Sequence, residues 1–387
     1  MQKLNRERSV DSQVASLIDA AIADQICVVP QTPSQCVRMS EWARAGRLVR
    51  VFPNMYITRP VERQWEGNPR IRAWWLTRTY ARRFPDRPLC SFSAAVVHGL
   101  WVSHSFLDRL YVVATEGETT HRAPGVFYRK VKDRNVVDIG GVKVTTIEQT
   151  VLDCVLAAPF AEGLAIADSA LRYRDVTNET LLAYFRKHGK RRPGIKKALL
   201  VARYACPDAE NGGESIARGL IIAVGYMPPT ALQVEFTDPV EPSKTLRVDG
   251  FFSLPGNRGV IFELDGMGKY PELWGGDAGP QGKSDDVEAQ TGEGSESPQA
   301  SDTFGFMDAG ACELTWDGSE SSAIDGEDDD AGLRGALIDE RQRESHITAL
   351  GYPVMRVLFK RIREDGYLVA LLRAYGIPQV QEPFPFA

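Results

Sequence analysis

The spacing of apolar and polar residues predicts short helices and strands in a mixed order along the chain. Apolar residues recur at helical intervals over Val14–Ile22 and over Ser34–Ala45. Two extended runs follow, Leu48–Phe52 and Met55–Thr58, and the Pro-Asn pair between them is a turn signal. The beginning of the chain is therefore expected to form two helices and then a small β-hairpin.

The middle of the chain also mixes the two periodicities. Short runs of Val, Tyr and Ile predict strands, and longer stretches with apolar residues three and four apart predict helices. We expect a helix over Arg70–Phe84, a short helix or turn over Ser91–Leu100, strands over Leu110–Ala114, Val126–Val131 and Val142–Thr145, and two further helices between Asp175 and Tyr204.

A helix is expected to open directly after the strand that ends at Thr145. Thr145 with Glu148, or Thr146 with Gln149, has the spacing of a capping box, in which two side chains satisfy backbone N–H groups of the first helical turn. Both offsets fit, so the sequence leaves the choice open.

The stretch Leu246–Tyr270 contains two apolar runs on either side of a Pro-Gly-Asn turn signal, which predicts two adjacent strands. Asp249 lies in the first run. Glu263 and Asp265 lie in the second and point to the same side, because side chains alternate along a strand. Carboxylates in an apolar strand are costly unless something compensates their charge.

Glu214 begins another apolar helix, and it shares an inward stripe with Ala217, Ile221 and Val224. A carboxylate on that stripe requires a partner. The alternative is that Glu214 is simply an acidic residue at a helix N-terminus, where the helix dipole favours it.

Charge is distributed unevenly along the 387 residues, although the net charge is only −5. Residues 1–210 hold about 32 bases and about 21 acids, so this part carries a net charge of about +11. Residues 271–336 hold about 17 acids and about two bases, and the stretch from about 272 to 332 is predicted to be a disordered acidic insert. The basic first part suits a nucleic-acid backbone, or it is merely a basic surface.

The six cysteines are dispersed and form no C-x-x-C pair, which fits a reducing compartment. The first residues lack the apolar core of a signal peptide, and no apolar run is long enough to span a bilayer. We therefore expect a cytoplasmic protein without membrane contact.

Arginines gather on the second helix and on the hairpin of the N-terminal region. Helix, helix and hairpin are the plan of a winged helix, in which these elements meet the major groove and the phosphates of double-stranded DNA. The alternative is a packing unit with solubilising arginines. The predicted DNA-binding residues are Arg38, Arg44, Arg47, Arg50 and Arg59.

The acidic strand pair predicts metal chemistry. A hard cation such as Mg²⁺ takes oxygen ligands, and carboxylates that hold such a cation beside an amine are typical of a metal-assisted phosphodiester nuclease. The stretch resembles the core of the PD-(D/E)XK nuclease superfamily, most closely its very-short-patch-repair-like branch. The resemblance covers residues 214–359 apart from the insert.

The resemblance implies Glu214, Asp249 and Glu263 as Mg²⁺ ligands and Asp265 as an extra ligand or orienting group. It departs from the family at Asp265, where the family has a lysine. Lys269 is then the candidate for positioning water or stabilising charge.

A helix over Leu333–Leu350 and a strand over Pro353–Phe359 are expected to resume the nuclease-like domain after the insert. Leu333, Leu337, Glu340, Glu344 and Ile347 share one stripe of this helix, so that two more carboxylates are expected to face the site.

The first half carries a second resemblance. In order along the chain, GRLVRV with a later Tyr, SAAVVHGL, VTTIEQTVLD and ADSALR resemble the AbiEi family, the antitoxins of type IV toxin–antitoxin systems. The matching residues are Gly46–Val51 with Tyr56, Ser93–Leu100, Val144–Asp153 and Ala167–Arg172. The resemblance implies a winged helix that binds operator DNA and a functional link to a nucleotidyltransferase-like toxin.

The sequence thus predicts an α+β and α/β multidomain protein. Residues 1–60 are expected to form a winged helix, residues 61–210 an AbiEi-like α/β and helical domain, and residues 211–387 a restriction-endonuclease-like mixed sheet flanked by helices. Two functions compete. One is a DNA-binding regulator of antitoxin type, and the other is a Mg²⁺-dependent DNA endonuclease that is directed to its target by the winged helix. A silent interaction module is a third possibility.

Overall fold

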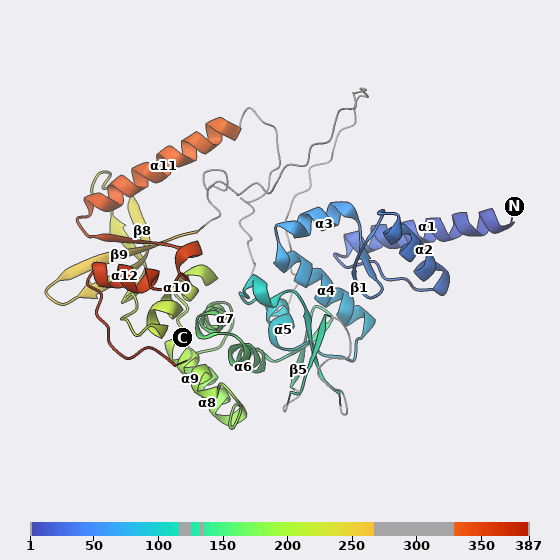
Figure 1. Cartoon of the computed structure of the whole chain (residues 1–387), viewed down its shortest axis with the longest axis horizontal. Helices are drawn as coiled ribbons and strands as arrows, with labels where there is room; N and C mark the ends of the chain where they lie inside the picture. Colours follow the sequence, from blue (N-terminus) through green and yellow to red (C-terminus); the bar gives the residue numbers. More distant parts are fainter. Residues whose placement is uncertain (1, 116–124, 132–134, 267–328, 386–387) are drawn as a thin grey trace.

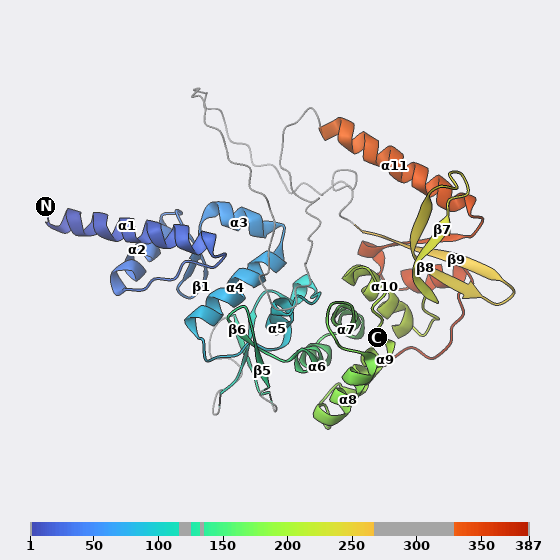
Figure 2. The ribbon, with the colours of Figure 1, turned by 180° about the vertical axis from the view of Figure 1, so that it is seen from behind.

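The chain folds into a mixed α and β protein that contains several small sheets (Figure 1). The computed structural model describes residues 2–115, 125–131, 135–266 and 329–385. The N-terminal helices lie at one end of the molecule, the four-stranded sheet lies at the other, and a helical middle part connects them (Figures 1 and 2).

The N-terminal region has the expected order of two helices and a hairpin. The capping box of Thr32 and Gln35 closes the first turn of the second helix, and Pro33 occupies its first position. Asn54 adopts the left-handed conformation with φ of 57° in the hairpin turn, which suits asparagine. The elements are α1 (Gln2–Ala23), α2 (Pro33–Arg44), β1 (Val49–Phe52) and β2 (Met55–Ile57).

A small core of its own supports this unit. Val14 of α1, Met39 of α2 and Tyr56 of β2 are fully buried in it, and Trp42 covers them. Strands β1 and β2 pair antiparallel. The arrangement fixes the hairpin against both helices.

The middle part combines short strands with a helical layer. Strand β3 pairs parallel with β4, β5 pairs antiparallel with β6, and Leu89 bridges β3 and β6. The strands are β3 (Leu110–Val113), β4 (Val126–Arg129), β5 (Val136–Ile139) and β6 (Val142–Thr145). The helices are α3 (Arg59–Glu66), α4 (Pro69–Arg83), α5 (Ser91–Val97), the 3-10 turn η1 (His104–Phe106), α6 (Ile147–Ala157), α7 (Phe160–Tyr173), α8 (Asn178–His188) and α9 (Ile195–Tyr204).

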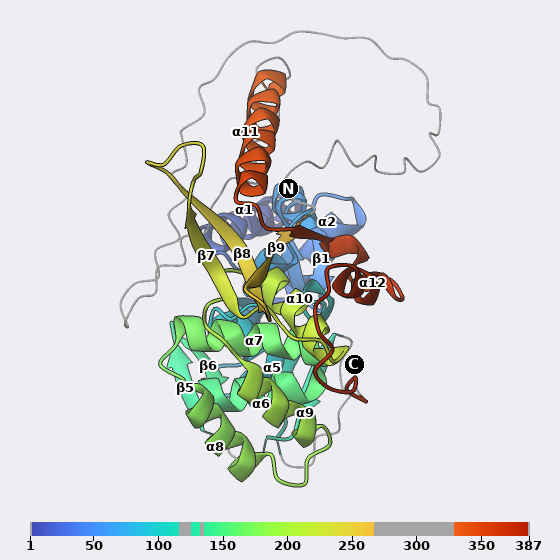
Figure 3. The ribbon, with the colours of Figure 1, turned by 90° about the vertical axis from the view of Figure 1, so that its left-hand side faces the viewer.

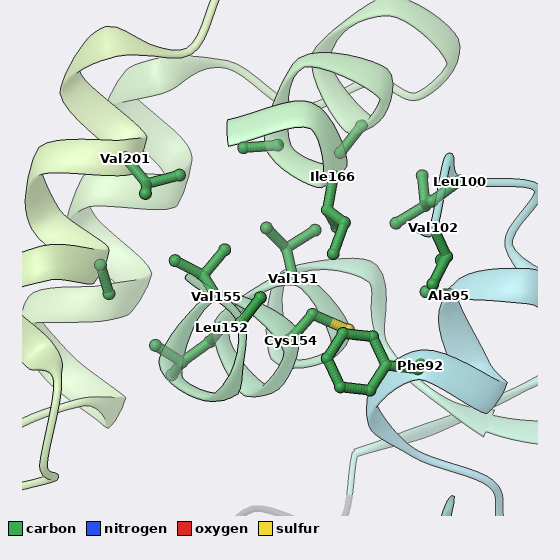
Figure 4. Packing of buried hydrophobic residues seen from close by; sticks show 14 of the residues in the cluster. Phe92, Ala95, Leu100, Val102, Val151, Leu152, Cys154, Val155, Ile166 and Val201 are labelled. Atoms are coloured by element: carbon green, nitrogen blue, oxygen red, sulfur yellow. The ribbon is translucent and has the colours of Figure 1, made fainter. Parts of the chain in front are cut away.

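One large apolar core unites these helices, and Figure 4 shows its centre. Phe92 of α5 points toward Cys154 of α6, Val151 of α6 faces Ile166 of α7, and Val155 of α6 lies on the side of Val201 of α9. Helices α6 and α7 are buried along most of their length, polar residues included, because this core covers them on several sides.

The predicted capping box at the start of α6 is wrong for both offsets. Thr146 is the N-cap residue, but its side chain makes no capping hydrogen bond and its hydroxyl oxygen is buried without a partner. The hydroxyl of Thr145 lies 2.7 Å from the hydroxyl of Thr150 instead. Thr145 belongs to β6 and is fully buried, so its side chain serves the packing of strand on helix rather than the helix end.

The C-terminal part is a four-stranded mixed sheet with helices around it. The strand order is β10-β9-β8-β7; β10 runs parallel to β9, and the other neighbours are antiparallel. Helix α11 stands beside β8, where the sheet projects from the middle helices (Figure 3). The elements are α10 (Gly212–Ala223), β7 (Ala231–Thr237), β8 (Thr245–Leu254), β9 (Arg258–Asp265), α11 (Asp329–Ala349), β10 (Val354–Leu358), the 3-10 turn η3 (Phe359–Arg361) and α12 (Tyr367–Ala374).

Helix α10 joins this sheet to the middle part by packing along α7. A Cβ atom on Gly219 would lie 2.8 Å from Cα of Ala161, so only glycine permits this close approach. Across the same interface Arg218 and Asp168 form an ion pair at 2.7 Å, with side chains 7% and 3% exposed. Residues 61–210 and 211–387 therefore meet across a buried contact.

Among the described residues, no helix is both long enough and apolar enough to cross a membrane.

Candidate functional site

The carboxylates predicted on the two strands lie side by side in the C-terminal sheet. Gly250 of β8 pairs with Phe262 of β9, which places Asp249 at the level of Glu263. Arg356 of β10 pairs with Glu263 from the other side. The backbone N–H of Leu264 donates to Asp249 at 2.7 Å, so this carboxylate also secures the end of the β8–β9 ladder.

Glu263 is bound by an arginine from α11. Its side chain is 6% exposed, and its two oxygens accept hydrogen bonds from the two terminal nitrogens of Arg343, each at 3.2 Å. Burial raises the pKa of Glu263, whereas the nearby Arg343 charge opposes this rise. The buried charge of β9 is thus compensated by a side chain 80 residues farther along the chain.

Asp265 has a more open environment. It lies two residues beyond Glu263 and contacts Arg356 at 3.4 Å, and the same arginine contacts Glu344 of α11 at 2.8 Å. Glu340 lies 3.7 Å from Arg343. The predicted α11 carboxylates Glu340 and Glu344 therefore contact arginines; Ile347 is buried, and the side chains of Leu333 and Leu337 lie outside the described part.

Glu214 is inward-facing, as the apolar stripe predicts, and is 5% exposed. Asn211, the N-cap of α10, donates to one oxygen at 2.6 Å; the backbone N–H of Glu210 and the side chain of Gln233 donate to the other at 2.8 and 2.9 Å. Burial raises the pKa of Glu214 to about 7, although its hydrogen bonds from Glu210 and Gln233 oppose this rise. Glu214 therefore faces inward and also accepts hydrogen bonds from residues at the N-terminal end of α10.

Glu214, Asp249 and Glu263 share one electrostatic neighbourhood. The charge of Asp249 raises the pKa of both glutamates further, beyond the effect of their burial. The sequence therefore selected three carboxylates that the fold brings near one another. Lys269, the predicted amine of this site, lies outside the described residues.

Protein donors already contact the oxygens of two of these carboxylates, Glu263 and Glu214. Mg²⁺ needs carboxylate oxygens that are free to converge on it. Here Arg343 occupies both oxygens of Glu263, and protein donors occupy both oxygens of Glu214. Within the described ranges, no group of three or more His, Cys, Asp or Glu residues is placed to hold a metal ion.

The five arginines predicted to bind DNA differ in their exposure and in the contacts that they make within the protein. Arg44 and Arg50 are exposed at the end of α2 and on β1. Arg47 is also exposed, and its guanidinium lies 4.2 Å from the ring centre of Trp42. Arg38 and Arg59 form ion pairs inside the unit.

Arg38 is the most constrained of the five. Both oxygens of Asp11 in α1 accept hydrogen bonds from its guanidinium, one of them at 2.7 Å, and Glu41 lies 3.1 Å away. Arg59 pairs with Glu62 at 2.6 Å. Arg44, Arg47, Arg50 and Arg59 are therefore exposed, and of these four Arg59 also pairs with Glu62.

The sequence alone assigned no role to Arg343 or Arg356. The structure places each of them on a β9 carboxylate. Gln233 was missed because β7 was not predicted, and its unusual φ of 50° and its contact with Glu214 appear only in the structure. The i,i+3 spacing of Glu340 and Arg343 could have indicated a charged helix face.

Comparison with known proteins assigns the chain to no family. No family model, curated protein or solved structure matches it.

Proposed function

We propose that this chain is a DNA-binding transcriptional regulator of AbiEi antitoxin type that carries a nuclease-like C-terminal domain. The observation that carries the proposal is the N-terminal unit of two helices and a hairpin, in which Arg44, Arg47 and Arg50 are each exposed. Exposed arginines on such elements are suited to phosphate oxygens and base edges of double-stranded DNA. Through its resemblance to the antitoxins, the proposal includes a functional link to a nucleotidyltransferase-like toxin.

The order of elements in the C-terminal part supports the nuclease-like component of the proposal. Helix α10 carries Glu214 and leads into the sheet. After α11, strand β10 completes the sheet by pairing with β9. These are the positions that the resemblance to the PD-(D/E)XK superfamily implies for them.

The proposal predicts specific DNA binding that depends on the hairpin arginines. The full chain should bind the DNA upstream of its own gene more tightly than random DNA at physiological salt. Combined Arg44→Ala and Arg50→Ala substitutions should weaken that binding by about tenfold or more. Each substitution should also lower the slope of log affinity against log salt concentration by an amount that corresponds to about one phosphate contact. Gel-shift titrations over a range of salt concentrations measure both effects.

Arg258→Ala provides the matched control, because Arg258 is an exposed arginine on the C-terminal sheet and its loss changes the net charge in the same direction. The control should bind like the wild type. Equal affinity of the wild type for its upstream DNA and for random DNA would contradict the regulator proposal.

A Mg²⁺-dependent DNA endonuclease is the second candidate. The proximity of Glu214, Asp249 and Glu263 favours it, whereas the hydrogen bonds that occupy Glu214 and Glu263 weigh against it.

A nicking assay on supercoiled plasmid with Mg²⁺ or Mn²⁺ tests this second candidate. Under the regulator proposal, the wild type and Glu263→Ala should both leave the plasmid intact while each still binds DNA. Nicking by the wild type that disappears in Glu263→Ala would establish the endonuclease instead.

A further inference from the structure

We infer that Arg343 supplies the cation of the carboxylate cluster, so that Asp249, Glu263 and their neighbours form an arginine–carboxylate site that excludes divalent metal. The inference concerns the C-terminal sheet alone and does not rest on DNA binding. It follows from where the guanidinium lies, what holds it there, and what a competing cation would have to displace.

The guanidinium of Arg343 already takes both oxygens of Glu263, one of the carboxylates that a metal ion would need. Its two terminal nitrogens reach the two oxygens of Glu263, which lies at the level of Asp249 in the sheet. A guanidinium forms such a fork-like pair with a carboxylate and keeps its charge at every physiological pH. The positive charge is therefore permanent and part of the chain.

Two further contacts of Arg343 fix it over the sheet. One terminal nitrogen also donates to the backbone carbonyl of Arg247 in β8 at 2.9 Å. On α11, Glu340 lies one turn before Arg343 at 3.7 Å. Because the contacts come from β8, β9 and α11, the side chain is held from three elements and links the helix to the sheet.

Other acids near the cluster also have partners within the chain. Arg356 contacts both Asp265 and Glu344. Glu214 accepts hydrogen bonds from Asn211 and Gln233. A divalent cation would have to break these contacts and send Arg343, which is 31% exposed, into solvent before it reached the carboxylates.

The inference predicts that removal of the Arg343 charge creates a metal site. Mn²⁺ added to the full-length wild type should bind weakly, and Mn²⁺ added to Arg343→Gln should bind at least about tenfold more tightly. The loss of the free Mn²⁺ signal in electron paramagnetic resonance measures this affinity without any assay of activity. Gln is shorter than Arg but stays polar, and it leaves the carboxylates without their cation.

Arg341→Gln is the matched control. Arg341 lies two residues away on the same helix and is exposed, so this variant has the same change in net charge and should bind Mn²⁺ like the wild type. Arg343→Lys keeps the charge and should also bind weakly. The double variant Arg343→Gln with Glu263→Gln should lose the gained site, which assigns that site to Glu263.

Two results would overturn the inference: tight Mn²⁺ binding by the wild type, or affinity of Arg343→Gln no higher than that of Arg341→Gln. Thermal melting checks that each variant is folded. If Arg343→Gln has no melting transition, Arg343→Met, which retains the apolar stem, takes its place in the same comparison. Gel-shift titrations of the same proteins report separately on the proposed regulator function.

Discussion

Replacement of Arg218 by alanine is expected to lower the free energy of unfolding by about 3 kcal/mol. The guanidinium lies between α10 and α7, where it pairs with Asp168 at 2.7 Å and donates to the carbonyl of Tyr204 at 2.8 Å. Its removal leaves the Asp168 carboxylate, 3% exposed, without its counter-charge. Calorimetric melting of the full chain would show the loss as a lower melting temperature.

An exposed ion pair serves as the control for this experiment. Arg247 pairs with Glu210, but the two side chains are 52% and 48% exposed. Arg247→Ala should therefore change the stability by less than about 1 kcal/mol. Equal shifts in the two variants would mean that the α7–α10 contact does not depend on its buried charges.

The stability of the wild type should fall, relative to that of Glu214→Gln, as the pH rises from about 4.5 to about 7. Burial raises the pKa of Glu214 from 4.5 to about 7, so the folded chain holds a proton that the unfolded chain has already released in this range. A group that binds its proton more tightly when folded stabilises the fold below its unfolded pKa, and this contribution is lost as the pH passes the folded pKa. The rise in pKa from 4.5 to about 7 corresponds to a change of about 3 kcal/mol in the free energy of unfolding.

Melting temperatures of both proteins, measured in parallel across this pH range, test the prediction. Glu214→Gln loses a hydrogen-bond acceptor, which shifts its melting temperature by a constant amount at every pH. The test is therefore whether the difference in melting temperature between the two proteins changes with pH. Glu235→Gln makes the same chemical change at an exposed position of β7 and should follow the wild type. A constant difference between the wild type and Glu214→Gln would contradict the prediction.

The fold was most predictable where local sequence decides the structure. The turn between β8 and β9 falls on the expected Pro-Gly-Asn signal, where Gly256 and Asn257 adopt φ of 79° and 57°. Helices α2 and α4 lie within one residue of their predicted starts and ends. These elements depend on residues that are close to one another in the sequence, so the sequence alone is enough to predict them.

Contacts between distant segments were not predictable in the same way. The apolar stripe placed Glu214 inside, yet its partner Gln233 comes from a strand without a clear apolar alternation. The partner of Glu263 lies 80 residues away on α11, and nothing local distinguishes Arg343 from the neighbouring Arg341. The capping box at α6 failed for a related reason, since burial of Thr145 outweighed its local capping geometry.

The parallel pairing of β10 with β9 has a consequence for how the chain is made. Residue 265 ends β9 and residue 358 ends β10, so 93 residues must be synthesised between them. At about 5–20 residues per second, β9 leaves the ribosome roughly 5–20 seconds before the strand that covers its edge. During this interval a bare strand edge can pair with another nascent chain. Correct assembly of the sheet is thus a matter of timing on the ribosome as well as of the contacts in the finished fold.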